Sequence, residues 1–355
     1  MFNGLRGRPY GAGVAVSVTN ACPLQCKHCI TNSSPKGEQA PDHFPDDLAR
    51  FLDRNDFETN HVTMTGGEPF HDLPKLIKLV QLAAKKGYEV GAITSSFWAK
   101  SPERAADVLS QLPGLRNLTL SVDAHHEKFV PQRFVRNAFA AAKAKGLVVK
   151  VRVCVQIPQT ADDDRLLEFV KSFADASEIE SQQIVPYGRS AEHSEFSEQM
   201  FAEQNECPAI GPHLFYNGDV IPCCNTIVPL RGNHPLRITR SENDESLQEA
   251  VLQNMLFVTL KTWGAQDLKD YLYPDATKNI TACDLCADVC TDSKLAQRAN
   301  EYLQSPQHRV RTYTFALLHM DIPLAEKYLK VALQELIEKN TPDVPEERAA
   351  FKSPH

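Results

Sequence analysis

The sequence predicts an α/β protein in which parallel strands and helices alternate from about residue 13 to residue 188. One observation is that short β-branched apolar runs alternate with amphipathic runs of helical period, two of which end at Gly87 and Gly146. The other is that chemically active side chains follow the strand-like runs. Because parallel strands need long crossover connections, this alternation favours one parallel sheet covered by helices.

Six strands and five helices account for this part of the chain. The run 45–52 begins with proline and acidic residues, which suit the first turn of a helix. The strand-like runs are rich in β-branched residues, as buried strands are. We expect strands at 13–19, 61–65, 88–94, 117–122, 147–157 and 180–185, and helices at 45–52, 76–86, 103–112, 134–145 and 165–173.

The composition limits the classes of function that we expect. The chain has 355 residues, enough for a large core and a second domain. Its net charge of −7 gives no basic field for nucleic acid, so no nucleic-acid partner is expected. The N-terminus lacks a signal sequence and no apolar run is long enough for a membrane span, so we expect a cytoplasmic protein without a membrane partner. The ten cysteines are then metal ligands rather than disulfides.

Three of these cysteines, Cys22, Cys26 and Cys29, lie in a loop directly after the first predicted strand. Three thiolates at this spacing can hold a [4Fe–4S] cluster and leave one iron open for a ligand. The alternatives are a zinc loop or three unrelated cysteines. Zinc needs a fourth ligand, and His28 lies inside the triad, where its geometry is poor.

This loop resembles the signature of the radical S-adenosylmethionine (radical SAM) superfamily, which follows the first barrel strand. The resemblance implies a partial (β/α)6 TIM-like barrel with its chemistry at the C-terminal ends of the strands. The run Gly66, Gly67, Glu68 and Pro69 after the second strand resembles the family's motif for the methionine part of SAM. By the same resemblance, further SAM contacts are expected at Ser95 after the third strand, at Ser121 and Asp123 after the fourth, and at Arg133. His125 and His126 are expected to be surface residues and not ligands.

A second region resembles the SPASM and Twitch auxiliary-cluster domains. Cys207, Gly218 and Cys223 match the opening pattern, and Asn217-Gly218 predicts a two-residue hairpin that returns Cys223 toward Cys207. Further along the chain, thiolates come from Cys283, Cys286 and Cys290. Six thiolates cannot supply four cysteines to each of two clusters, so we expect one auxiliary [4Fe–4S] cluster. The spacing does not fix which four cysteines bind it, and zinc is the rival metal.

Cys224 stands where peptide- and sulfatase-modifying relatives commonly carry an aspartate that can act as a base. A thiol there can donate a hydrogen atom to a substrate radical, which would make the reaction redox-neutral. The alternatives are that Cys224 is a cluster ligand or a buried apolar residue. Cys154, within the fifth strand, is a competing donor that could equally belong to the core.

These regions suggest three domains: a radical SAM barrel at 1–205, an auxiliary-cluster domain at 206–295, and a C-terminal helical extension and tail at 296–355. The turn Pro186-Tyr-Gly-Arg189 resembles one that follows the last barrel strand in relatives with an added cluster domain. The runs 241–260 and 262–272 are predicted to be helical linkers. An amphipathic helix is expected at 323–337, docked on the barrel or on another subunit.

The resemblance implies a radical SAM enzyme of oxidoreductase or isomerase type. It would cleave SAM reductively to a 5′-deoxyadenosyl radical that takes a hydrogen atom from the substrate. A peptide substrate, modified by crosslinking, epimerisation or oxidation, is favoured, and a sugar or other small metabolite is the alternative. A non-catalytic iron–sulfur carrier or scaffold would have no use for the SAM contacts. No flavin motif is visible, so the electron donor is expected to be a separate flavodoxin or ferredoxin.

Overall fold

The computed structural model describes residues 10–193, 196, 207–223, 234–238, 246–275, 280–319 and 322–340. Its centre is one eight-stranded sheet in the order β6-β5-β4-β3-β2-β1-β7-β8. Neighbouring strands from β1 to β6 run parallel, which confirms the predicted α/β class. The strands are β1 (Val14–Ser17), β2 (His61–Thr65), β3 (Glu89–Thr94), β4 (Leu115–Val122), β5 (Val148–Val155), β6 (Ile179–Gln183), β7 (His213–Leu214) and β8 (Val220–Ile221).

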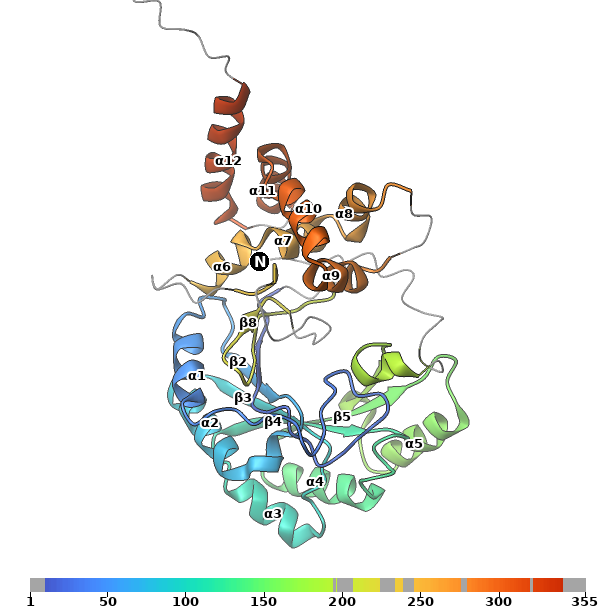
Figure 1. The fold of residues 1–355 in the computed structure, drawn as a ribbon. Coiled ribbons are helices and arrows are strands. Elements are labelled where there is room, and N and C mark those ends of the chain that lie inside the picture. Colours follow the sequence, from blue (N-terminus) through green and yellow to red (C-terminus); the bar gives the residue numbers. More distant parts are fainter. Residues whose placement is uncertain are drawn as a thin grey trace, which may run out of the picture.

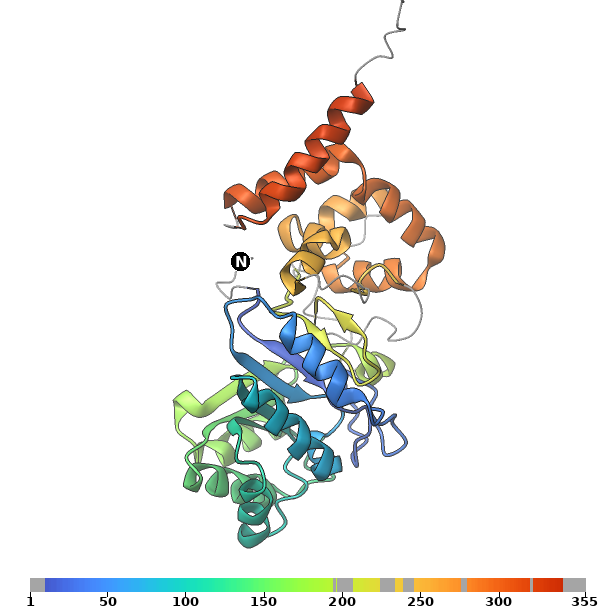
Figure 2. The same ribbon diagram turned by 90° about the vertical axis from the view of Figure 1, so that its left-hand side faces the viewer.

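Five helices connect β1 to β6 and cover the outer face of the curved sheet (Figures 1 and 2). Each predicted helix is present, with ends shifted by a few residues. Capping explains several starts: Ser101 accepts a hydrogen bond from the Arg104 amide, and Thr160 forms a capping box with Asp163. The helices are α1 (Phe44–Asp53), α2 (Leu73–Lys85), α3 (Pro102–Ser110), α4 (Gln132–Ala144) and α5 (Ala161–Lys171); 3-10 turns η1 (Pro69–Asp72) and η2 (Ala176–Glu178) precede α2 and β6.

The two faces of the sheet carry different side chains, and β2 shows the division. Val62 and Met64 are fully buried in the core. The alternate residues, Thr63 and Thr65, line a cavity on the inner face. Because successive side chains of a strand point to opposite faces, this alternation packs the helices on one side and leaves a polar wall on the other.

The predicted hairpin forms, but not as a two-residue turn. Leu214 pairs with Val220, and the Gly218 amide donates to the Phe215 carbonyl at 2.8 Å, so the turn spans 215–219. The Phe215 amide also donates to the Asp219 carbonyl at 2.8 Å, so this pair closes a three-residue loop, 216–218, in which Gly218 has a φ of +84°. Strand β7 also pairs in parallel with β1, which makes the hairpin part of the barrel's sheet. The boundary between 205 and 206 stays a prediction.

Helices gather beyond the hairpin: α6 (Leu247–Gln253), α7 (Met255–Thr262), α8 (Ala265–Leu272), α9 (Ala282–Thr291), α10 (Ser293–Leu303), α11 (Pro306–His319) and α12 (Ala325–Asn340). The predicted linkers therefore lie in α6, α7 and α8. The predicted C-terminal helix is α12, which packs against α11 and points away from the barrel (Figure 1). Residues 241–245 and the tail 341–355 lie outside the described residues. No helix in the described ranges is long and apolar enough to cross a lipid bilayer.

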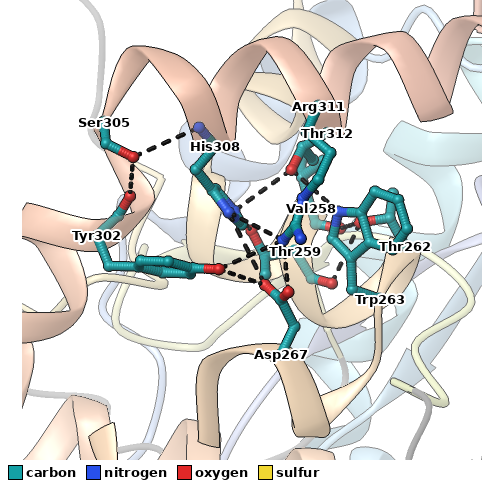
Figure 3. Close-up of polar contacts among 10 residues, drawn as sticks. All are labelled: Val258, Thr259, Thr262, Trp263, Asp267, Tyr302, Ser305, His308, Arg311 and Thr312. Atoms are coloured by element: carbon teal, nitrogen blue, oxygen red, sulfur yellow. Dashed lines mark hydrogen bonds and ion pairs between the residues drawn. The ribbon is translucent and has the colours of Figure 1, made fainter. Parts of the chain in front are cut away.

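A buried polar network joins four of these helices (Figure 3). His308 Nε2 and the Thr259 hydroxyl of α7 are 2.8 Å apart, and the Tyr302 hydroxyl of α10 donates to Asp267 of α8 at 3.0 Å. Arg311 of α11 also binds Asp267. Burial lowers the pKa of His308 to about 4. The network fixes the bundle on which α9 holds its three cysteines, since α9 packs against α8 and α10.

Candidate active site

Many chemically active side chains line a cavity of about 460 Å³ on the inner face of the sheet. Among the predicted site residues, the cavity brings together Cys22, Cys26, Cys29, Gly66, Gly67, Glu68, Ser95 and Ser121. Most of these residues directly follow a strand or end it, where the loops of parallel β/α barrels build their sites.

The cysteine loop is held in place by its own backbone. The Cys22 amide donates to the Ser34 carbonyl at 2.9 Å, and the Cys29 amide donates to the Cys26 carbonyl at 3.2 Å. All three thiols are free. Leu24 and Val130 pack with Cys26 in a small apolar cluster beside Phe97 and Phe134. Burial raises the pKa of Cys22 to about 12, so a metal must displace its proton.

Arg189, far from this loop in the sequence, binds its backbone through hydrogen bonds. Arg189 donates from Nη1 to the Cys26 carbonyl at 2.8 Å and from Nη2 to the Ser33 carbonyl at 2.6 Å. Its amide donates to the Cys29 carbonyl at 2.9 Å. The Pro186–Arg189 turn, singled out in the sequence, therefore organises the cysteine loop from the far end of the barrel.

The Gly66-Gly67 turn runs against the same loop. The Gly67 amide donates to the Thr19 carbonyl at 2.7 Å, and the Glu68 amide donates to the Ala21 carbonyl at 3.0 Å. A Cβ on Gly67 would lie 2.2 Å from the Ala21 carbonyl oxygen, and one on Gly66 (φ +125°) would lie 2.3 Å from that of Thr19. Both glycines are therefore required by close backbone contact within the protein.

Replacing Gly67 with alanine is expected to displace the cysteine loop, because the new Cβ overlaps backbone that cannot rotate away. We expect at least half of the iron bound by the cysteine loop to be lost, with SAM affinity lost alongside it. Iron analysis and equilibrium dialysis measure the two quantities. Gly91→Ala is the matched control, since its Cβ would meet no atom closer than 3.4 Å. Wild-type iron content in Gly67→Ala would contradict this role of the turn.

The Glu68 carboxylate is fully engaged inside the protein. It accepts hydrogen bonds from the Thr94 hydroxyl at 2.8 Å, and from the Ser95 amide and hydroxyl at 2.8 Å and 2.6 Å. Burial raises its pKa, and these bonds partly offset that effect. The Ser95 hydroxyl is thus committed to Glu68, and the pair fixes the end of β3 beside the cavity.

Asp123 lies behind the cavity wall instead of lining it. Its carboxylate accepts from the amides of His125 and His126, at 2.9 Å and 2.8 Å, and contacts the rings of His126 and His28. Burial alone would raise the pKa of Asp123, but His126 and His28 outweigh it and hold it well below its usual range. The structure places this carboxylate against two histidines, and its predicted contact with SAM stays a prediction.

The expected surface location of His125 and His126 is wrong. His126 lines the cavity and interacts with Cys26, and burial by itself would lower its pKa, but Asp123 holds it well above the usual value. His125 is buried, and burial lowers its pKa to about 4. Arg133, by contrast, is exposed, stacks over Phe134 and lies outside the cavity lining.

Sequence reasoning missed several polar residues of the cavity wall. Arg152, Gln182, Gln183 and His213 all line the cavity, as does Cys154. Arg152 and Cys154 alternate with valines along β5, and such polar alternation is unusual in a parallel sheet buried on both faces. That pattern was the available signal for a cavity. Burial raises the pKa of Cys154 to about 12, so its thiol stays protonated.

His213 is 2% exposed, and its Nε2 lies 2.8 Å from the Ser17 hydroxyl. Burial lowers its pKa from 6.5 to about 3. Between pH 3 and pH 6.5, this histidine binds a proton in the unfolded chain but not in the folded chain. The free energy of unfolding is therefore highest above pH 6.5 and falls as the pH drops toward 3. We expect a loss of up to about 4 kcal/mol over this window.

The check is the free energy of unfolding of wild type and His213→Gln, measured at several pH values across this window. The variant should show a flatter acid limb than the wild type. Exposed His71 provides the control, His71→Gln, which should keep the wild-type slope. Equal slopes in wild type and His213→Gln would refute the assignment.

A second group of thiols lies between the hairpin and α9. The pKa of Cys286 is raised well above its ordinary value, first by its hydrogen bond to Cys290, then by burial and by the nearby Cys290, Cys223 and Cys207. Cys290 also interacts with His234. Cys283 instead neighbours the Tyr187 hydroxyl. The structure therefore groups Cys207, Cys223, Cys286 and Cys290, and Cys224 lies outside the described residues.

Comparison with known proteins gives consistent findings. The family model described as the radical SAM superfamily matches residues 16–171. YydG of Bacillus subtilis (strain 168), whose name refers to peptide biosynthesis, is 20% identical over 265 residues, covering 72% of this chain and 82% of YydG.

Two solved structures are also similar. Native anSMEcpe with bound AdoMet is 12% identical with a TM-score of 0.50, covering 91% of this chain and 99% of that one, and supports the fold. Streptococcus suis SuiB bound to S-adenosylmethionine is 13% identical with a TM-score of 0.42, covering 63% of this chain. The chain spans 62% of SuiB, less than two thirds of its length.

Proposed function

Residues 16–171 form a radical SAM domain, and from this premise we propose that the chain is a radical SAM enzyme that modifies a peptide. The observation that carries the proposal is the single cavity shared by three free thiols and the Gly66–Glu68 turn. The name of YydG supports the peptide as substrate class.

The residues present fit the two cofactors of the family, a [4Fe–4S] cluster and SAM. Cys22, Cys26 and Cys29 supply three thiolates from one loop, and His28, the rival zinc ligand, is bound to Asp123 through Nε2 at 3.2 Å. Gly66 and Gly67 keep side-chain atoms out of the wall beside that loop. When bound, the cluster supplies the electron that cleaves SAM and so provides the radical that takes hydrogen from the substrate.

The protein's own contribution is to fix the cysteine loop and to shield it from water. Arg189 and the Gly66-Gly67 turn hold its backbone from two sides. Leu24, Val130 and neighbouring aromatic rings form an apolar shield around Cys26. Asp123 orients His126 against Cys26 from behind. Such outer contacts fix the orientation of metal ligands and tune the metal.

For the second cysteine group we infer one auxiliary [4Fe–4S] cluster held by Cys207, Cys223, Cys286 and Cys290. These four thiols are neighbours across the hairpin and α9, and four cysteines complete a cubane. Cys283 is left outside this set because its neighbour is Tyr187. The same four cysteines could also bind a zinc ion, so metal analysis must distinguish zinc from an iron–sulfur cluster.

The electron for SAM cleavage comes, in this proposal, from a flavodoxin or ferredoxin-type protein, because the sequence shows no flavin motif. The thiol of Cys224 is a candidate hydrogen donor to the substrate radical. With four other thiols already grouped, the auxiliary cluster does not require Cys224 as a ligand.

The test is anaerobic reconstitution followed by incubation with dithionite and SAM. We expect about eight irons per chain, from two cubanes, and formation of 5′-deoxyadenosine. About four irons with one bound zinc would replace the auxiliary cluster by a zinc site. Absence of 5′-deoxyadenosine from protein with full iron content would refute the proposed activity.

A further inference from the structure

The two edges of the sheet differ. At one edge, β8 is covered: Val220 forms an antiparallel bridge with Ile238, whose amide donates to the Val220 carbonyl at 2.9 Å. At the other edge, β6 pairs with β5 and with no other described strand. One edge of the barrel sheet is therefore closed within the described chain, while the other is open.

The direction of the β6 backbone follows from one hydrogen bond. The Ile184 amide donates to the Val155 carbonyl of β5 at 2.9 Å. In a parallel strand, alternate residues direct both backbone groups to the same side. Gln182 therefore faces β5, whereas the amide and carbonyl of Ser181 and Gln183 face the open edge. Among the described residues, neither makes a backbone hydrogen bond on that side.

β6 lacks three of the features that commonly protect an edge strand, and its one charged side chain, Glu180, is paired with Arg152 of β5 at 3.1 Å. Natural edge strands are commonly blocked by proline, lysine or a β-bulge. The sequence Ile-Glu-Ser-Gln-Gln contains neither residue, and its register with β5 is regular over all five pairs. Ser181 and Gln182 are exposed. An open and regular edge of this kind is a template for an added strand.

The open edge leads into the cavity. Gln182, Gln183, Ile184 and Val185 line the same cavity as the three cysteines of the N-terminal loop. We propose that the peptide substrate binds as an extended strand added to β6, which carries one of its residues into the cavity. This inference rests on the proposed function, since it takes a peptide as substrate. Backbone hydrogen bonds would supply affinity, and the cavity would select the modified residue.

The test removes the two outward amides. Proline has no N–H and is tolerated on edge strands, so Ser181→Pro with Gln183→Pro deletes both donors and spares the bonds to β5. Ser181→Ala with Gln183→Ala is the matched control that keeps both amides. The probe is a pool of random ten-residue peptides displayed on mRNA and enriched on the wild-type holoprotein with SAM. Both variants lack the Gln183 side chain that lines the cavity and differ in the two amides, so we expect about tenfold weaker binding to the proline variant than to the alanine variant.

Iron content and peptide-free formation of 5′-deoxyadenosine report whether the proline variant is folded. If it is not, the same pool is rebuilt with backbone esters and tested on wild type, where weaker binding again supports strand addition. Equal binding by both variants, or no enrichment on wild type, overturns the inference. Loss of self-association by the proline variant with peptide binding intact also overturns it, since β6 would then pair with a second copy. Failure of the proposed function is distinct, because wild type would then form no 5′-deoxyadenosine.

Discussion

Changing Cys22, Cys26 and Cys29 together to alanine is expected to remove about four of about eight irons per chain and to abolish 5′-deoxyadenosine formation. The reason is local: these three cysteines form no disulfide, come from one loop and line one cavity. The proposed auxiliary cysteines flank the hairpin or lie on α9, outside this loop, so their iron should remain. Iron and sulfide analysis with product chromatography measures both effects.

The informative control is Cys283→Ala, which removes a thiol outside the four-cysteine group. It should keep both clusters. Retention of about eight irons by the triple variant would show that this loop is not the cluster site. Loss of nearly all iron in the triple variant would instead show that the second cysteine group cannot hold a cluster independently.

The barrel could be predicted because its strands are local patterns. Runs such as Val14–Ser17 and Val148–Val155 are rich in valine, and the helices between the strands carry caps and glycine stops. The hairpin was harder. Asn217-Gly218 indicates a turn, but a glycine with positive φ fits both two-residue and three-residue hairpin loops, so these two residues alone do not fix the loop length.

The residues of the candidate site likewise fall into two groups, those predicted from local sequence and those set by tertiary structure. Cysteine spacing and the glycine turn are local, so Cys22 and Gly67 were predicted together and lie together. The contact between Asp123 and His28 could not be predicted because the two residues come from different loops that meet only in the fold. Arg152 and His213 were missed because they lie on strands far apart in the sequence whose inner faces come together only in the curved sheet. The four-cysteine group likewise depends on the return of α9 to the hairpin.

The grouping of Cys207, Cys223, Cys286 and Cys290 changes the expectation for Cys224. The sequence alone favours Cys224 as a cluster ligand or a buried apolar residue over hydrogen donation. If the four grouped thiols hold the proposed cubane, Cys224 is not needed as a ligand. As a donor, the Cys224 thiol would give its hydrogen atom to the substrate carbon radical. The S–H bond breaks, a C–H bond forms, and one electron from the flavodoxin or ferredoxin-type donor with one solvent proton restores the thiol.

Cys224→Ser is therefore expected to keep about eight irons and 5′-deoxyadenosine formation and to lose the epimerised product. In deuterated water, the wild-type enzyme should place one solvent deuterium on the product carbon, because thiol hydrogens exchange with solvent. Mass spectrometry of the product peptide measures this incorporation.

Cys154→Ser is the matched variant, because Cys154 lines the cavity and burial keeps its thiol protonated, with a pKa of about 12. It should retain product and deuterium incorporation. Lost product in Cys154→Ser with full activity in Cys224→Ser would show that Cys154, on the barrel wall, is the hydrogen donor. Lost iron in Cys224→Ser would make Cys224 a ligand after all, and one of the four grouped cysteines would then be dispensable. The pair of variants thus assigns the hydrogen donor by position: one thiol stands on β5 within the barrel, and the other follows the hairpin that returns to α9.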